Sequence, residues 1–124
     1  MARKKELLPY LDPSNYDREQ VLRGEMEVPL KDIVGGSDLR YKSFYEDWMP
    51  THDDPRYDSI YNAAKQARNP KKFLESIGWI DVFCLNFRSR KDRKCYVVSD
   101  GHRRVAIAHR LGIEKLRVDV VELI

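Results

Sequence analysis

The chain is organised around residues 95–112, which read CYVVSDGHRRVAIAHRLG. Residues 95–98 are apolar and typical of a strand, and residues 105–111 are typical of a helix that ends at Gly112. Asp100 is predicted to cap this helix, because its carboxylate can accept a hydrogen bond from the first backbone N–H groups. Gly101 allows a sharp turn. The stretch therefore predicts a strand, a tight turn and a helix in direct succession.

The start of this predicted helix has the chemistry of an anion-binding site. The first backbone N–H groups of a helix lack internal partners, and the helix dipole adds partial positive charge there. Gly101 leaves the turn uncovered, and cationic or polar donors follow at His102, Arg103 and Arg104. This pattern indicates a phosphate site in which Asp100 is either held in its capping bond or is a reacting group. The plainer alternative is a purely structural turn in which His102 and His109 only pack.

Length and composition bound the possible classes. The 124 residues suit one domain with an N-terminal arm, and the net charge of +3 is too small to imply nucleic-acid binding by itself. The two cysteines, Cys84 and Cys95, lie in apolar runs and favour buried thiols over a disulfide or metal pair. There is no signal-peptide pattern and no apolar run long enough to span a membrane. We therefore expect a soluble, cytoplasmic protein with no membrane partner.

Residues 1–25 are predicted to form a helical arm and residues 26–124 the main domain. Ser14 is expected to cap a helix that continues over Val21 and Leu22 towards Gly24. Residues 26–34 alternate between apolar and polar and predict a strand that Gly35-Gly36 ends. Pro29 restricts it to an edge or to the side of the strand that makes no ladder hydrogen bonds. Residues 38–49 interleave aromatic and basic side chains, a pattern that fits packing on the core better than base stacking.

Three strands, and two helices besides the one at residues 105–111, are predicted from residue 54 onward. Asp54-Pro55 begins a helix with apolar residues at positions 57, 60, 61 and 64, and Asn69-Pro70 begins a second helix that Gly78 ends. The strands are expected at residues 80–87, 94–98 and 116–123. The order βααββαβ indicates an α+β fold. His52-Asp53-Asp54 lacks a second ligand pair, so no metal site is expected.

An ordered set of motifs over about residues 26–123 resembles the ParB/sulfiredoxin superfamily. Val28-Pro29-Leu30 resembles its opening strand, and Ile80-Asp81-Val82 resembles its middle strand. Residues 100–104 resemble the box that reads Gly-Cys-His-Arg in sulfiredoxins and Gly-Glu-Arg-Arg in ParB proteins, and Leu111-Gly112-Ile113 resembles its close. Residues 33–44 further resemble a bacterial group of ParB-like proteins.

The resemblance implies a small mixed sheet with helices packed on it and a nucleotide phosphate, of ATP or CTP with Mg²⁺, held at the box. His102 and Arg103 match the phosphate-binding pair of sulfiredoxins, and Arg56 and Ser59 match the helix Lys and Ser that also touch phosphate there. Gly101 stands where sulfiredoxins have their catalytic Cys, so sulfiredoxin activity is not expected. The Asn-x-x-Arg motif and the helix-turn-helix domain of ParB proteins are not found, which argues against CTP-driven clamping on DNA.

Two functions are therefore weighed. The first is a nucleotide-dependent phosphotransferase or nucleotide hydrolase, with Asp100 or Glu27 as the base. The second is a non-catalytic DNA-binding or regulatory module, with a second copy of the chain as a further candidate partner. This module would bind DNA through a basic hairpin tip formed by Arg88, Arg90, Lys91 and Arg93. A solvated loop is the simpler explanation for the same residues. A helix-turn-helix over residues 104–121 is disfavoured, because its second half is rich in β-branched residues.

Overall fold

The computed structural model describes residues 18–36 and 53–124. In chain order the elements are β1 (Gln20–Pro29), a 3₁₀ turn (Leu30–Asp32), β2 (Ile33–Gly36), α1 (Pro55–Gln66), α2 (Pro70–Ser76), β3 (Asp81–Cys84), β4 (Tyr96–Asp100), α3 (His102–Arg110) and β5 (Lys115–Leu123). The chain has an α+β fold, as predicted, with three helices and one mixed sheet in the part that the structure describes.

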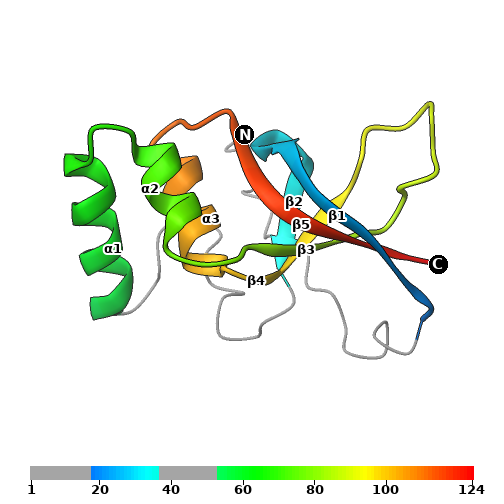
Figure 1. Ribbon diagram of the computed structural model, residues 1–124, viewed down its shortest axis with the longest axis horizontal. Coiled ribbons are helices and arrows are strands. Elements are labelled where there is room, and N and C mark those ends of the chain that lie inside the picture. The colour runs from blue at the N-terminus through cyan, green and yellow to red at the C-terminus, as the bar shows by residue number, and fades with distance from the viewer. Residues whose placement is uncertain (1–17, 37–52) are drawn as a thin grey trace, which may run out of the picture.

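The five strands lie in the order β1-β5-β3-β4-β2. β1 pairs antiparallel with β5, and β3 pairs antiparallel with β4. The pairs β3–β5 and β2–β4 are parallel. Figure 1 shows the three helices gathered at one end of the molecule, whereas the loop between β3 and β4 extends from the opposite end. This arrangement separates the predicted phosphate turn from the predicted basic hairpin.

The main core lies between the helices and one face of the sheet. Four consecutive residues of α3 are buried because the helix is enclosed by α1, α2 and the sheet: Val105, Ala106, Ile107 and Ala108. Along β5, Leu116, Val118 and Val120 alternate with outward-facing residues and are at most 1% exposed. A smaller apolar cluster comprises Phe83, Val97 and Leu123. Each of the buried Val, Leu, Ile and Phe side chains contributes roughly 1.5–3 kcal/mol, so α3 and β5 are central to stability.

The predicted N-terminal helix is wrong over its second half. Val21, Leu22 and Gly24 belong to β1, which pairs with β5 from Gln20 opposite Leu123 onward. The register of the β1–β5 pair shifts between Leu22 and Gly24, and Gly24 takes a φ of 84° at this irregularity. The predicted boundary at residue 25 therefore runs through a strand. Residues 1–17, which include Ser14, lie outside the described residues, as do residues 38–49.

The single strand predicted over residues 26–34 is also wrong. β1 ends at Pro29, a 3₁₀ turn follows, and β2 then lies at the other edge of the sheet, beside β4. Gly35 and Gly36 do not end a strand but belong to β2. The predicted edge position of Pro29 is confirmed, because β1 is the outermost strand beside β5. The observed order is ββααββαβ rather than βααββαβ.

Both helices predicted from their caps are confirmed. Asp54 caps α1 by accepting a hydrogen bond of 3.1 Å from the Tyr57 backbone N–H, and Asn69 caps α2 through a 3.1 Å bond from Lys72. The cysteines are free thiols, as predicted, and burial raises the pKa of both Cys84 and Cys95. Among the described residues no helix is long and apolar enough to cross a bilayer.

Candidate functional site

The turn between β4 and α3 is built on glycine and not on an aspartate cap. Gly101 occupies the N-cap position with φ 94° and ψ 27°, a left-handed conformation. A Cβ there would lie 3.1 Å from Ile80 Cγ1, so the residue also needs the space. The predicted cap at Asp100 is wrong, because Asp100 is the last residue of β4 and pairs with Asp81. Asp100 is exposed and makes no side-chain hydrogen bond within the described part of the chain.

The N-termini of α1 and α3 are fastened together by one carboxylate. Asp54 caps α1 and also accepts from Arg103 Nε, with Oδ2 at 3.0 Å and Oδ1 at 3.2 Å. The side chains of Asp54 and Arg103 are 8% and 30% exposed, so this charge-assisted contact is partly shielded from water. Since β2 and β4 run parallel, their carboxyl ends point to the same side of the sheet, where α3 begins. We call this convergence of two helix starts, formed by residues 54–57 and 100–104, the helix-start corner.

Arg104 adds a partly buried guanidinium to the corner. Its Nη2 donates to the Trp79 carbonyl at 2.9 Å, and its Nη1 is buried with no hydrogen-bond partner among residues 18–36 and 53–124. Burial lowers the pKa of Arg104, nearby Asp100 and Asp81 act to raise it, and the positive charge of Arg56 lowers it further. Arg56 of α1 therefore acts electrostatically on Arg104 of α3.

His102 packs against the end of β2. A Cβ on Gly36 would lie 2.7 Å from His102 Cδ2 and 2.9 Å from its Nε2, so a larger residue at position 36 would push the imidazole out of this position. Gly36 is a site residue that sequence reasoning missed, although a Gly pair at the end of an apolar run is a recognised sign of close approach. Ser59 is exposed on α1, and no contact links it to α3 in the described ranges. The structure thus brings His102, Arg103, Arg104 and Arg56 together, but not Ser59.

A second missed residue is Asp81, which lies opposite Asp100 of β4 on one side and Asp119 of β5 on the other. Burial raises the pKa of Asp81, the charges of Asp119 and Asp100 raise it further, and Arg104 lowers it. The alternative base, Glu27, lies on β1, which β5 and β3 separate from β4. Its carboxylate pairs with Lys71, whose hydrogen bond and charge lower the Glu27 pKa.

The described residues around the corner form no metal centre of their own. Within the residues that the structure describes, no group of three or more His, Cys, Asp or Glu side chains is arranged to hold a metal ion. Asp54 of the predicted weak metal motif is instead the partner of Arg103. His109, on the same helix as the corner, is a packed histidine, and burial lowers its pKa to about 4.

Several cations of the predicted nucleic-acid hairpin already pair with other groups of the protein. Arg88 Nε lies 3.1 Å from Glu122 Oε2, and Arg93 pairs with Asp32 and also donates to the Lys31 carbonyl. The neighbouring Lys94 donates to three backbone carbonyls, those of Asn86, Phe87 and Ser89.

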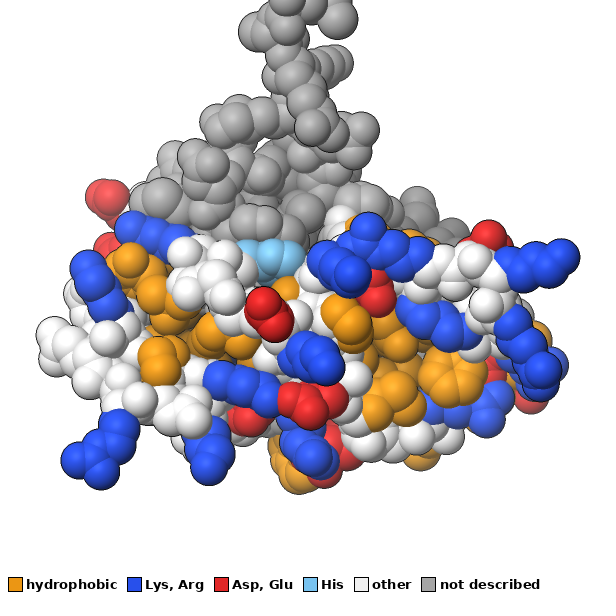
Figure 2. Space-filling model, turned by 90° about the horizontal axis from the view of Figure 1, so that it is seen from above, with side chains coloured by type: hydrophobic (Ala, Val, Ile, Leu, Met, Phe, Trp, Pro, Cys, Tyr) orange, Lys and Arg blue, Asp and Glu red, His pale blue; other side chains and the backbone are white. Residues whose placement is uncertain are grey.

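Arg90 and Lys91 remain exposed at the hairpin tip. Arg110 of α3 stacks over Tyr61 with its Cζ 3.7 Å from the ring centroid. Figure 2 shows Lys and Arg side chains spread over the visible face and interleaved with acidic ones. That face does not carry one continuous basic surface.

The resemblance to ParB and sulfiredoxins rests on the residues themselves. A scan against protein-family models found no family that matches, and a search of the curated proteins found no match. The proposal for a function is therefore built on the geometry of the helix-start corner and on four of its side chains: Arg56, His102, Arg103 and Arg104.

Proposed function

We propose that the chain is a ParB/sulfiredoxin-like domain that binds the phosphate groups of a nucleotide, ATP or CTP, at the helix-start corner. The observation that carries this proposal is the Asp54–Arg103 contact, which holds the N-termini of α1 and α3 side by side. The start of α3 has no side-chain cap and offers unpaired backbone N–H groups, whereas at α1 the Tyr57 N–H is already bonded to Asp54, so that start contributes mainly its partial positive charge. Two converging starts offer a phosphate more positive charge than one helix alone.

The side chains support the same ligand class. Arg56 and Arg104 act on each other as like charges, and the Nη1 atom of Arg104 is buried without a hydrogen-bond partner among the described residues. An anion bound between the two would relieve the repulsion and accept charge-assisted hydrogen bonds. In the proposal Gly101 supplies the left-handed turn that begins α3, His102 and Arg103 line the first turn, and Ser59 lies farther along α1.

Mg²⁺ fits this corner as a companion of the nucleotide. Magnesium in nucleotide sites is held by phosphates and water with one or two carboxylates, so a complete protein cage is not needed. Asp100 is exposed and engaged in no cap, and Asp81 lies opposite it on β3. Asp81 would hold the ion, which would supply charge neutralisation on the phosphates, and Asp100 would stay free to act as the base.

Turnover is the second part of the proposal, as a phosphotransferase or nucleotide hydrolase. Phosphoryl transfer needs positioning and charge neutralisation more than covalent chemistry. Asp100 would accept the proton of the attacking hydroxyl or water, and Arg103 and Arg104 would stabilise the negative charge. An Asp100→Asn variant is expected to lose phosphate release and keep nucleotide binding. Equal loss of both would remove Asp100 from the role of base.

A thermal-shift screen with ATP, CTP, GTP, ADP and inorganic phosphate, each with and without Mg²⁺, tests the binding proposal. A ligand at a hundred times its dissociation constant stabilises by ~2.7 kcal/mol, which corresponds to roughly 10 °C for a domain of this size. Arg56→Gln is expected to reduce the shift, whereas Arg90→Gln, an equal charge change at the hairpin tip, leaves it unchanged. The absence of a shift with both ATP and CTP in the presence of Mg²⁺ would reject the proposal.

A second candidate function is a DNA-binding or regulatory module without catalysis. It rests on Arg90 and Lys91, which are exposed at the hairpin end of the molecule, away from the helices (Figure 1). Two free cations neutralise few phosphates, so this function predicts weak DNA binding with a shallow salt dependence. Gel shifts at several salt concentrations would measure it.

A further inference from the structure

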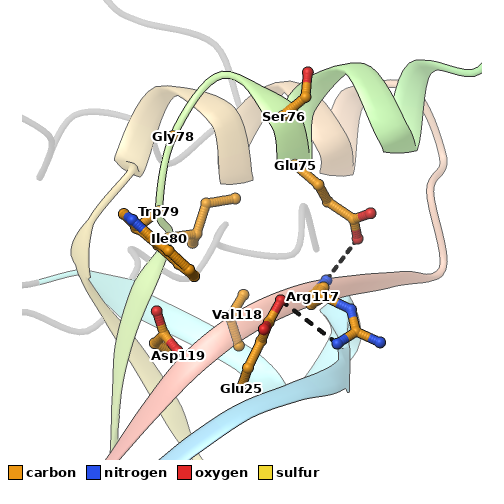
Figure 3. Close-up of a pocket in the computed structure, with 9 residues that line it drawn as sticks. All are labelled: Glu25, Glu75, Ser76, Gly78, Trp79, Ile80, Arg117, Val118 and Asp119. Atoms are coloured by element: carbon orange, nitrogen blue, oxygen red, sulfur yellow. Dashed lines mark hydrogen bonds and ion pairs between the residues drawn. The ribbon is translucent and has the colours of Figure 1, made fainter.

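A cavity of about 360 Å³ lies beside the helix-start corner, between the end of α2, the linker to β3, and strands β5 and β1. Its floor is apolar, because Ile80 and Val118 are 2% and 1% exposed. Figure 3 shows carboxylate side chains entering from β1, β5 and α2, and the Trp79 ring along one side. The volume is in the range that small-molecule sites occupy.

Trp79 forms an aromatic wall of this cavity. Its side chain is 67% exposed, although an indole is usually far more covered. The backbone beneath it is tied down, because the Trp79 carbonyl accepts from Arg104 at 2.9 Å and the Ile80 carbonyl accepts from the Asp119 N–H at 2.8 Å. The backbone that carries the indole is therefore fixed at the cavity before any ligand arrives, so binding has to order the Trp79 side chain alone.

The cavity lining carries more negative than positive charge. Glu25, Glu75 and Asp119 are acidic, and Arg117 is the one basic residue in the lining. Arg117 is already engaged, since its Nη1 lies 3.5 Å from Glu25 Oε1 and its backbone N–H donates to Glu75 Oε2 at 2.7 Å (Figure 3). Glu75 also lies 3.9 Å from Lys71 Nζ.

Asp119 is the carboxylate of the lining that remains uncompensated. It makes no ion pair within the described stretches, and it lies near the Trp79 ring (Figure 3). Its neighbour across the sheet, Asp81, has its pKa raised by burial and then by the Asp119 charge. An unneutralised negative potential of this kind repels phosphate and attracts a cation.

We propose that this cavity binds an organic cation, a guanidinium or alkylammonium group, with its charge between the Trp79 indole and Asp119 and its carbon chain on Ile80 and Val118. The face of an indole is the strongest aromatic partner for such cations, and a carboxylate adds a charge-assisted hydrogen bond. The apolar floor distinguishes an organic cation, which carries a hydrocarbon stem, from a hydrated metal ion. The inference does not rest on nucleotide binding at the helix-start corner.

The test is isothermal titration of the full chain with Nα-acetyl-argininamide, which carries one guanidinium and no other charge. The matched control ligand is Nα-acetyl-citrullinamide, which has nearly the same shape and is neutral. Binding of the first and not of the second supports the proposal. Equal binding of both, or no heat from either at millimolar ligand, overturns it.

Variants then locate the site. Trp79→Leu and Asp119→Asn are each expected to weaken binding by roughly three- to thirtyfold, the range that cation–π and exposed charge contacts span. Asp92→Asn removes one charge from the hairpin loop and is expected to change nothing. Unchanged affinity in both cavity variants would overturn the proposal. Fluorescence in a Trp48→Phe background, which leaves Trp79 as the remaining tryptophan, is expected to change with the arginine ligand alone.

Discussion

The contact between Asp54 and Arg103 gives the most direct test of the helix-start corner. Asp54 both caps α1 and pairs with Arg103 Nε at 3.0 Å while 8% exposed. Losing an N-cap costs about 1 kcal/mol, and a charge-assisted hydrogen bond contributes roughly 1.5–3 kcal/mol. Asp54→Ala removes both and is expected to lower the free energy of unfolding by roughly 2–4 kcal/mol.

Asp54→Asn separates the two contributions, because asparagine caps helices as well as aspartate does and carries no charge. We expect it to lower the free energy of unfolding by about 1 kcal/mol, since a neutral hydrogen bond to Arg103 can persist. Asn69→Ala is the matched control, because Asn69 caps α2 and makes no ion pair in the described part of the chain. Its expected cost is about 1 kcal/mol from the cap alone.

The assay is urea unfolding followed by circular dichroism, with the m-value checked for two-state behaviour. A double-mutant cycle with Arg103→Met, which keeps the aliphatic stem, isolates the pair and is expected to give a coupling of roughly 1–2 kcal/mol. If Asp54→Ala and Asn69→Ala cost the same and the cycle shows no coupling, the two helix starts are not fastened as described. The basis for phosphate binding at their junction would then be lost.

Three further outcomes are expected. Gly101→Ala should lower the free energy of unfolding by roughly 2–3 kcal/mol in urea titrations, because φ is 94° and a Cβ would lie 3.1 Å from Ile80. The control Gly112→Ala, at a position with φ 71° and open space around the Cβ, should cost about 1 kcal/mol. Burial lowers the His109 pKa to about 4 in the native state, whereas the unfolded chain keeps the ordinary value of 6.5, so the unfolded state binds a proton first as the pH falls. The free energy of unfolding should therefore decrease between pH 6.5 and pH 4, by roughly 3 kcal/mol more in the wild type than in His109→Gln. Any DNA affinity of the hairpin should depend on Arg90 and Lys91 and show a log–log salt slope no steeper than about −1.8, and a steeper slope in gel shifts would contradict this.

The sequence by itself determined the elements whose signals are local. Asp54-Pro55 and Asn69-Pro70 carry the chemistry of helix starts within four residues, and α1 and α2 begin there. The alternation of residues 116–123 predicted β5, and the strand-turn-helix order around Gly101 is present in the structure. Each signal depends only on neighbouring residues, so a linear reading recovers it.

Only the tertiary structure decided which distant groups meet. Residues 20–25 form a strand because β5 offers them a partner, and their own spacing did not reveal it. Asp100 does not cap α3, because Gly101 occupies the N-cap position in a left-handed conformation. Arg88 and Arg93 are not available to DNA as predicted, because they form ion pairs with Glu122 and Asp32. Hydrogen bonds and ion pairs act over about 3–4 Å in space. The position of a residue along the chain does not fix such distances until the sheet order is known.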